Sequence, residues 1–150
     1  MKIGFRMATP GDVPDLARLR SLGWGDVDYW IPRITGYMTG ASNPQKALPE
    51  RVVYVATDGK LIIGLIAGHL TQRLDCEGEL EWIDVDTEYR RKGIASELVR
   101  VLATWFAGQN ARKICVDPGN DAARKFYAAN GTANLNDHWM YWENISILMK

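Results

Sequence analysis

A short run of cations followed by a glycine offers groups that could hold phosphate. The sequence changes there from the alternation of a strand to the spacing of a helix. Gly93 lacks a Cβ atom, so the backbone can approach a ligand, and the unpaired N–H groups of the new helix carry partial positive charge. A pyrophosphate would suit such a helix start. We expect its contacts to come from Arg90, Arg91, Lys92, Gly93, Ile94, Ala95 and Ser96.

The spacing of this segment excludes two common phosphate-binding loops. Arg90, Gly93 and Ala95 form an R-x-x-G-x-A pattern. This pattern lacks the Lys-Ser or Lys-Thr ending of a P-loop, and it lacks the three glycines of a dinucleotide fingerprint. Neither ATP nor NAD is therefore the expected ligand.

Two separate motifs resemble the GNAT superfamily of acyl-CoA N-acyltransferases. Residues 85–90, Val-Asp-Thr-Glu-Tyr-Arg, lead into R-x-x-G-x-A much as the V-D-x-x-Y-R strand end leads into the family's Q/R-x-x-G-x-G/A signature. Alone, this segment also fits an ordinary strand-to-helix turn with solvated basic residues. A second segment, at the expected distance downstream, resembles the family's N-x-x-A-x-x-F-Y-x-x-x-G pattern through Asn120, Ala123, Phe126, Tyr127 and Gly131.

The resemblance implies that acetyl-CoA is the co-substrate and lies between a strand at 79–86 and a strand at 112–116. The pantetheine arm would pair with the backbone at Ile83, Asp84 and Val85, because its amides offer the donors and acceptors of a peptide. Asn120 would add a side-chain contact on the helix face that carries Tyr127. We expect the Arg90 side chain to turn back and support the loop.

Acyl transfer to an amine needs a base, a polarised thioester carbonyl and an acid for the departing thiolate. The resemblance implies that Tyr127 is the general acid, and core packing is the alternative interpretation. Glu79 and Glu81 are the candidate bases, each acting through a water, and Glu77 is a weaker third. Alternation along the strand places Glu79 and Glu81 on the same face as Ile83 and Val85. The alternative is that these acids are only the solvated end of a strand.

Composition limits the other classes of function. The chain has 150 residues, with 18 Lys plus Arg and 18 Asp plus Glu, so its zero net charge recruits neither nucleic acid nor an anionic membrane. We expect one domain over 1–150 and a cytoplasmic location, because the apolar run at 61–70 is too short to span a bilayer and residues 1–4 lack the core of a signal peptide. Cys76 and Cys115 are expected to be free thiols, and no metal is expected.

The predicted fold class is α/β (α+β), with a GNAT-like mixed, mostly antiparallel central sheet flanked by helices, in the order β-α-α-β-β-β-α-β-α-β-β. This order is similar to the complete family fold. Residues 40–50 are expected to be a loop. The expected strands are 2–8, 52–57, 61–70, 77–86, 112–116 and a pair within 132–147, and the expected helices follow residue 9 and cover 26–39, 93–107 and 120–130.

The predicted function is an N-acetyltransferase that moves an acetyl group directly to a primary amine of a small molecule or peptide. A non-catalytic acyl-CoA-binding or sensing module is the alternative, and a nucleotide-binding module ranks last. An aromatic and acidic rim near Trp24, Trp30 and Asp26 would suit an amine, yet these spacings are also typical of a core. His69 is expected to be structural, and the aromatic C-terminal strands could pair in a homodimer.

Overall fold

Long strands with buried, alternating residues form the centre of the molecule. The computed structural model describes residues 2–149, so predictions that involve Met1 or Lys150 lie outside the described residues at those two positions. The strands are β1 (Ile3–Met7), β2 (Ala47–Asp58), β3 (Leu61–Thr71), β4 (Gly78–Val85), β5 (Ile114–Val116), β6 (Ala133–Asn134) and β7 (Met140–Trp142). The α-helices are α1 (Val13–Ser21), α2 (Val27–Thr39), α3 (Ile94–Gly108) and α4 (Asp121–Ala129).

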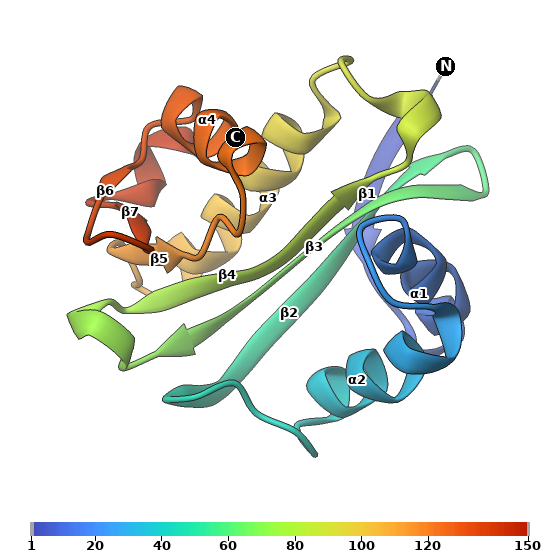
Figure 1. The fold of residues 1–150 in the computed structure, drawn as a ribbon, viewed down its shortest axis with the longest axis horizontal. Helices are drawn as coiled ribbons and strands as arrows, with labels where there is room; N and C mark the ends of the chain where they lie inside the picture. The colour runs from blue at the N-terminus through green and yellow to red at the C-terminus, as the bar shows by residue number, and fades with distance from the viewer. Residues whose placement is uncertain (1, 150) are drawn as a thin grey trace.

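These strands form one seven-stranded sheet in the order β1-β2-β3-β4-β5-β7-β6. Every neighbouring pair is antiparallel except β4 and β5, which are parallel. The mixed, mostly antiparallel sheet and the predicted element order are both confirmed, and Figure 1 shows the strands as a twisted central layer.

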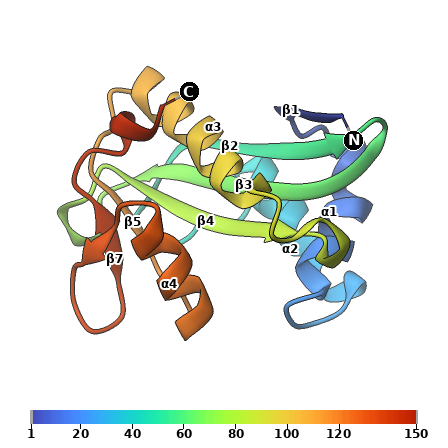
Figure 2. The ribbon, with the colours of Figure 1, turned by 90° about the horizontal axis from the view of Figure 1, so that it is seen from above.

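Helices cover both faces of the sheet, as the two views in Figures 1 and 2 show. Helices α1 and α2 lie on one face, over a core that includes Leu16, Ile34 and Leu65. Helix α3 lies on the other face, over a core that includes Leu98 and Ile114, and α4 contributes Tyr127 to that core. The two faces of β4 therefore meet two different cores.

Strand boundaries differ from the predictions in two places. The expected loop at 40–50 ends early, because β2 already begins at Ala47 and pairs with Thr71 at the far end of β3. The predicted strand pair within 132–147 is much shorter than expected: β6 has two residues and β7 has three. The early start of β2 was not predicted, because the residues there are polar or turn-forming. They become extended only through pairing with β3.

Candidate active site

The basic segment forms a tight loop that ends at the start of α3. A short 3₁₀ helix (Thr87–Tyr89) begins at Asp86, whose carboxylate accepts a hydrogen bond from the Glu88 N–H at 3.3 Å. Gly93 then adopts a left-handed conformation with φ of 79°, and no side chain caps the first turn of α3. The N–H groups of that turn are therefore free to bind an anion.

A cavity of about 220 Å³ lies at this helix start. A Cβ atom at Gly93 would meet nothing within 4 Å, so the loop backbone borders open space. The residues that line the cavity are Val85, Tyr89, Arg90, Arg91, Gly93, Ile94, Ala95, Ser96 and Phe126. Sequence reasoning gave Tyr89 and Phe126 no role at this site. Phe126 packs against the core under α3, and the packing of α4 beside the loop also brings it to the cavity wall.

The side chain of Arg90 turns back toward the strand, as expected. Its Nε donates a hydrogen bond to the carbonyl oxygen of Val85 at 3.2 Å, which ties the loop to the end of β4. Arg91 adopts a positive φ of 62°, and Arg91 and Lys92 are both exposed. The backbone of the loop, together with these two exposed cations, is therefore what an anion would meet.

Strands β4 and β5 part soon after they meet. Their ladder runs from Gly78 with Ile114 to Leu80 with Val116, and β4 continues to Val85. Among the described residues, 82 to 85 pair with a strand on the β3 side only. The backbone groups on the other side of this segment form an open edge that an extended ligand could pair with.

A β-bulge at Glu81 changes which side chains share a face of β4. Ala67 of β3 pairs with Trp82, whereas the next residue, Gly68, pairs with Leu80, so Glu81 is the extra residue. Trp82 packs with the core under α1 and α2, and Ile83 packs with the core under α3. The expectation that Glu79 and Glu81 share a face with Ile83 and Val85 is therefore wrong, because a bulge shifts the alternation by one residue.

The bulge gathers titratable side chains on the face of α1 and α2. One potential ligand atom from each of His69, Glu79 and Glu81 lies within 4.8 Å of the others. Glu79 is 5% exposed and lies 3.2 Å from Nε of Arg73 and 3.5 Å from Nε2 of His69. Burial, followed by the charge of Glu79, raises the pKa of the half-buried Glu81. A carboxylate with a raised pKa is a suitable proton acceptor near neutral pH.

Glu77 has a structural position and does not join this group. Its carboxylate accepts hydrogen bonds from the N–H groups of Arg112 at 2.8 Å and Lys113 at 3.1 Å. These two hydrogen bonds lower the pKa of Glu77. Glu77 thus connects the start of β4 to the segment before β5. A carboxylate that is already hydrogen-bonded and has a lowered pKa is a poorer candidate for the base.

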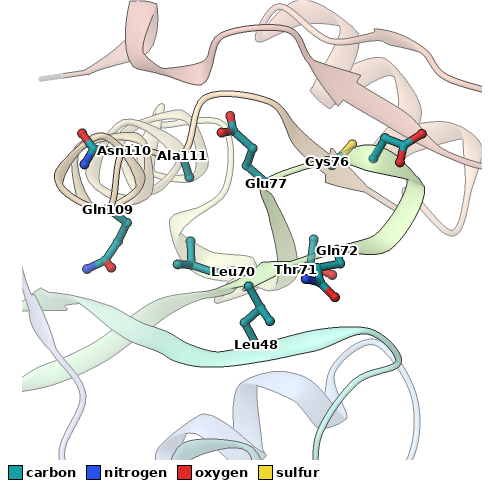
Figure 3. Close-up of a pocket in the computed structure, with 10 residues that line it drawn as sticks. Leu48, Leu70, Thr71, Gln72, Cys76, Glu77, Gln109, Asn110 and Ala111 are labelled. Atoms are coloured by element: carbon teal, nitrogen blue, oxygen red, sulfur yellow. The ribbon is translucent and has the colours of Figure 1, made fainter.

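Glu77 and Cys76 border a second cavity of about 500 Å³, at the opposite end of β4 from Gly93 (Figure 3). Side chains from β2, from the end of β3 and from the end of α3 surround it, including Leu48, Thr71 and Gln109. The basic loop contributes no residue to this cavity. We therefore locate the candidate site at the smaller cavity and the adjoining edge of β4.

Tyr127 lies in the core between α4 and the sheet. The residue is 4% exposed, and its ring contacts those of Phe126 and Trp142 with centroid distances of 5.2 and 5.9 Å. Its hydroxyl makes no hydrogen bond to another residue of the described chain. Burial, followed by the charge of Asp84, raises the pKa of Tyr127, so the phenol keeps its proton.

The side chain of Asn120 caps helix α4. The side-chain Oδ1 of Asn120 accepts a hydrogen bond from the Ala123 N–H at 2.8 Å, which makes Asn120 the N-cap of α4. The exposed Asn120 lines a separate cavity of about 160 Å³ with His138. Because a capping residue has extended backbone and turns its side chain toward its own helix, helical spacing alone does not place Asn120 on the same helix face as Tyr127.

The aromatic rim is largely packed. The Arg20 guanidinium lies 4.4 Å from the ring centroid of Trp30 and 5.3 Å from that of Trp82, and it pairs with Asp84 at 2.8 Å. The Asp84 side chain is therefore engaged on the α1 face, and only its backbone can serve the open edge of β4. Trp24 remains 58% exposed.

The chain thus has a mixed sheet in which the parallel strands β4 and β5 part beside an uncapped, basic helix start. The chain belongs to the acetyltransferase (GNAT) family, because the family model matches residues 18–132. That range contains the loop at Gly93, the acids of β4 and Tyr127. A comparison with curated proteins found no match.

Solved structures show the same fold. A GNAT-family structure from Desulfovibrio desulfuricans has a TM-score of 0.77 at 17% identity and covers 96% of this chain and 99% of its own. An aminoglycoside 6'-N-acetyltransferase complexed with coenzyme A has a TM-score of 0.74 at 19% identity, with 97% of each chain covered. PaiA N-acetyltransferase from Thermoplasma acidophilum, also in complex with coenzyme A, has a TM-score of 0.69 at 16% identity, with 95% of this chain and 99% of its own covered. Separately, no helix among residues 2–149 is long and apolar enough to cross a membrane.

Proposed function

We propose that the protein transfers an acetyl group from acetyl-CoA directly to a primary amine. The observation that carries this proposal is the uncapped start of α3, which borders a cavity beside the open edge of β4. Free N–H groups and a free strand edge are the two kinds of group that a pyrophosphate and a pantetheine arm require. Because the chain belongs to the GNAT family, an acyl-CoA is the natural ligand to supply the pyrophosphate and the pantetheine arm.

The residues of the loop and of β4 divide the work of binding. We assign the pyrophosphate to the N–H groups of residues 91 to 96, with Arg91 and Lys92 adding positive charge. We assign the pantetheine arm to the backbone of Ile83, Asp84 and Val85. Asn120 keeps only its amide N–H groups for such a contact, because its oxygen caps α4.

Glu81 is the better supported base and Tyr127 the proposed acid. Glu81 is half-buried and has a raised pKa, so it can accept the proton of an ammonium group through a water. Glu79 is held by Arg73 and His69 and supports Glu81 with its charge. Tyr127 keeps its proton and can give it to the departing thiolate, while a β4 N–H near Val85 would polarise the carbonyl.

The acceptor remains a primary amine of a small molecule or a peptide. Glu79 and Glu81 favour a cationic acceptor over an anionic one. One structural neighbour is an aminoglycoside 6'-N-acetyltransferase, which makes aminoglycosides a reasonable first probe. The sequence-based expectations of one domain over 1–150, of a cytoplasmic location and of pairing in a homodimer stay predictions.

The function is tested by thiol release from acetyl-CoA in the presence of an amine panel. The panel contains aminoglycosides, polyamines, lysine peptides and peptides with free N-termini. We expect at least one class to release thiol above the hydrolysis rate, with the acetylated amine detected by mass spectrometry. Absence of turnover across the whole panel, by protein that binds coenzyme A, would favour the non-catalytic module instead.

A further inference from the structure

Three side chains of metal-ligand type meet where the bulge of β4 faces β3. His69 of β3 offers an imidazole nitrogen, and Glu79 and Glu81 of β4 offer carboxylate oxygens, all within 4.8 Å of one another. One nitrogen and two oxygens suit zinc and the neighbouring divalent metals. We infer that His69, Glu79 and Glu81 form a binding site for a divalent transition-metal ion of the zinc class.

Two of these atoms are buried without a hydrogen-bond partner. Nε2 of His69 and Oε1 of Glu79 have none within the part of the chain that the structure describes, and His69 is 0% exposed. The two atoms face each other across 3.5 Å. Buried polar atoms are rarely left unpaired in proteins, and an exception calls for an explanation such as an ion. A metal ion bound by both atoms would satisfy them together.

The other ring nitrogen of His69 has the partner that a metal-bound histidine needs. Nδ1 lies 2.9 Å from the hydroxyl oxygen of the buried Tyr37. When Nδ1 carries the proton it donates to Tyr37, and the lone pair of Nε2 then points toward Glu79. Outer partners of this kind fix the tautomer and orientation of metal-ligating histidines.

Arg73 is the cation that competes for this position. Its Nε lies 3.2 Å from Oε1 of Glu79, and its guanidinium lies 4.8 Å from the ring centroid of Trp139. Arg20, on the far side of Trp82, adds positive charge near Glu81. Because Arg73 is partly exposed on a turn and already contacts Trp139, it can leave Glu79 without losing all its contacts. Removal of Arg73 should therefore strengthen metal binding.

Sequence reasoning predicted no metal because the two cysteines are too few and too far apart for a zinc site and the histidines are not clustered. His69 and Glu79 are ten positions apart, and the antiparallel register of β3 and β4 makes them direct partners. The metal site goes beyond the proposed acyl transfer and does not depend on it. If both are correct, a bound metal and the acceptor ammonium compete for Glu81.

The test is metal binding by untagged protein that has first been treated with a chelator. Zn²⁺ is titrated by calorimetry and Co²⁺ by its visible absorption. We expect one ion per chain, with affinity lowered at least about 100-fold in Glu81→Gln and about 10- to 100-fold in Tyr37→Phe. His69→Gln should abolish tight binding, Arg73→Gln should bind several-fold tighter, and His138→Gln, which changes the exposed second histidine, should bind like the wild type.

Several results would overturn the inference. The site is wrong if wild type binds no tighter than Glu81→Gln, or if the Co²⁺ spectrum contains the near-ultraviolet bands of thiolate ligation, which would assign the metal to the cysteines. Circular dichroism checks that each variant folds. If His69→Gln does not fold, the test depends on Glu81→Gln, which is isosteric and changes a half-buried residue. These readouts need no acetyl transfer, so an inactive protein leaves the metal result intact. In active protein, Zn²⁺ should compete with the amine and not with acetyl-CoA.

Discussion

The two glutamates of β4 have the same side chain but different surroundings. Glu79 is buried against His69 and Arg73, whereas Glu81 is half-buried at the bulge, and its pKa is raised by burial and by Glu79. Sequence reasoning could not choose between them, because their positions in a strand are equivalent by alternation. Our proposal assigns the base to Glu81, since its side chain is only partly buried and its pKa is raised.

Glu81→Gln tests this choice through the pH dependence of turnover. A base must be deprotonated, so wild-type turnover should fall as pH drops through a pKa above the ordinary glutamate range. The variant should lose about 10²-fold or more in kcat near neutral pH, together with that acidic limb. A pH–rate profile of both proteins checks this, and an unchanged acidic limb in the variant would assign the base elsewhere.

The same variant has an expected effect on stability. The folded state raises the pKa of Glu81, so its stabilising contribution is complete below the unfolded pKa and is lost as pH rises through the folded pKa. Glu81→Gln should therefore be more stable than wild type near neutral pH, and the difference should shrink in acid. Urea unfolding at several pH values measures it, and a variant that is less stable at neutral pH would contradict the burial argument.

Tyr127→Phe separates an enzyme from a module that only binds acyl-CoA. Tyr127 is protonated and its hydroxyl bonds to no other described residue, so removal of the oxygen should leave the core packed. We expect kcat to fall about 10²-fold, the typical contribution of a general acid, with little change in the affinity for coenzyme A. Steady-state kinetics and calorimetry on the same preparation provide the two numbers. Unchanged kcat would point to another acid.

At the scale of elements, the candidate site depends on two local irregularities. The bulge at Glu81 shifts the alternation of β4, so that Ile83 packs toward α3 while Glu79 and Glu81 lie on the other face. The loop from Asp86 to Gly93 brings the backbone of α3 to the cavity in an uncapped form. The motif predicted this loop. No residue type in the sequence marks the bulge, because register is a property of two paired strands.

Gly93→Ala tests the loop geometry. Gly93 has φ of 79° with open space around its missing Cβ, so alanine adds backbone strain of about 1–2 kcal/mol without a steric clash. We expect lower stability and weaker binding of coenzyme A, as the N–H groups of the first turn move. Gly108→Ala is the matched control, because Gly108 also lies in open space, at the end of α3, and its φ is not positive. Equal coenzyme A affinities in the two variants would argue against the loop as the pyrophosphate site.

At the scale of the whole molecule, the site joins segments that only the fold brings together. In the proposed site, β4 would supply acids and a free edge, α3 its N-terminus, and α4 both Phe126 at the cavity wall and Tyr127 in the core. A ligand that bridges these three elements should stabilise the folded state as a unit. Coenzyme A is long enough to touch all three, whereas ATP shares its nucleotide but has no pantetheine arm.

We therefore expect coenzyme A to protect the protein against heat more than ATP does. At a concentration of 100 times its Kd, coenzyme A should add about 2.7 kcal/mol to the free energy of unfolding. Thermal melts with each ligand at matched concentrations check this. Equal protection by the two would assign the loop to nucleotides in general, and no protection by coenzyme A would remove the basis of the proposed function.

The sequence by itself determined the element order and the basic loop, and its resemblance to a known family implied the mixed sheet. These features depend on local periodicity and on residues close together in the chain, such as Arg90 and Gly93. Tertiary structure decided the rest: the face on which Glu79 and Glu81 lie, the capping role of Asn120, and the meeting of His69 with Glu79. The physical reason is that strand register, bulges and helix docking depend on pairing between distant segments, which no local pattern encodes.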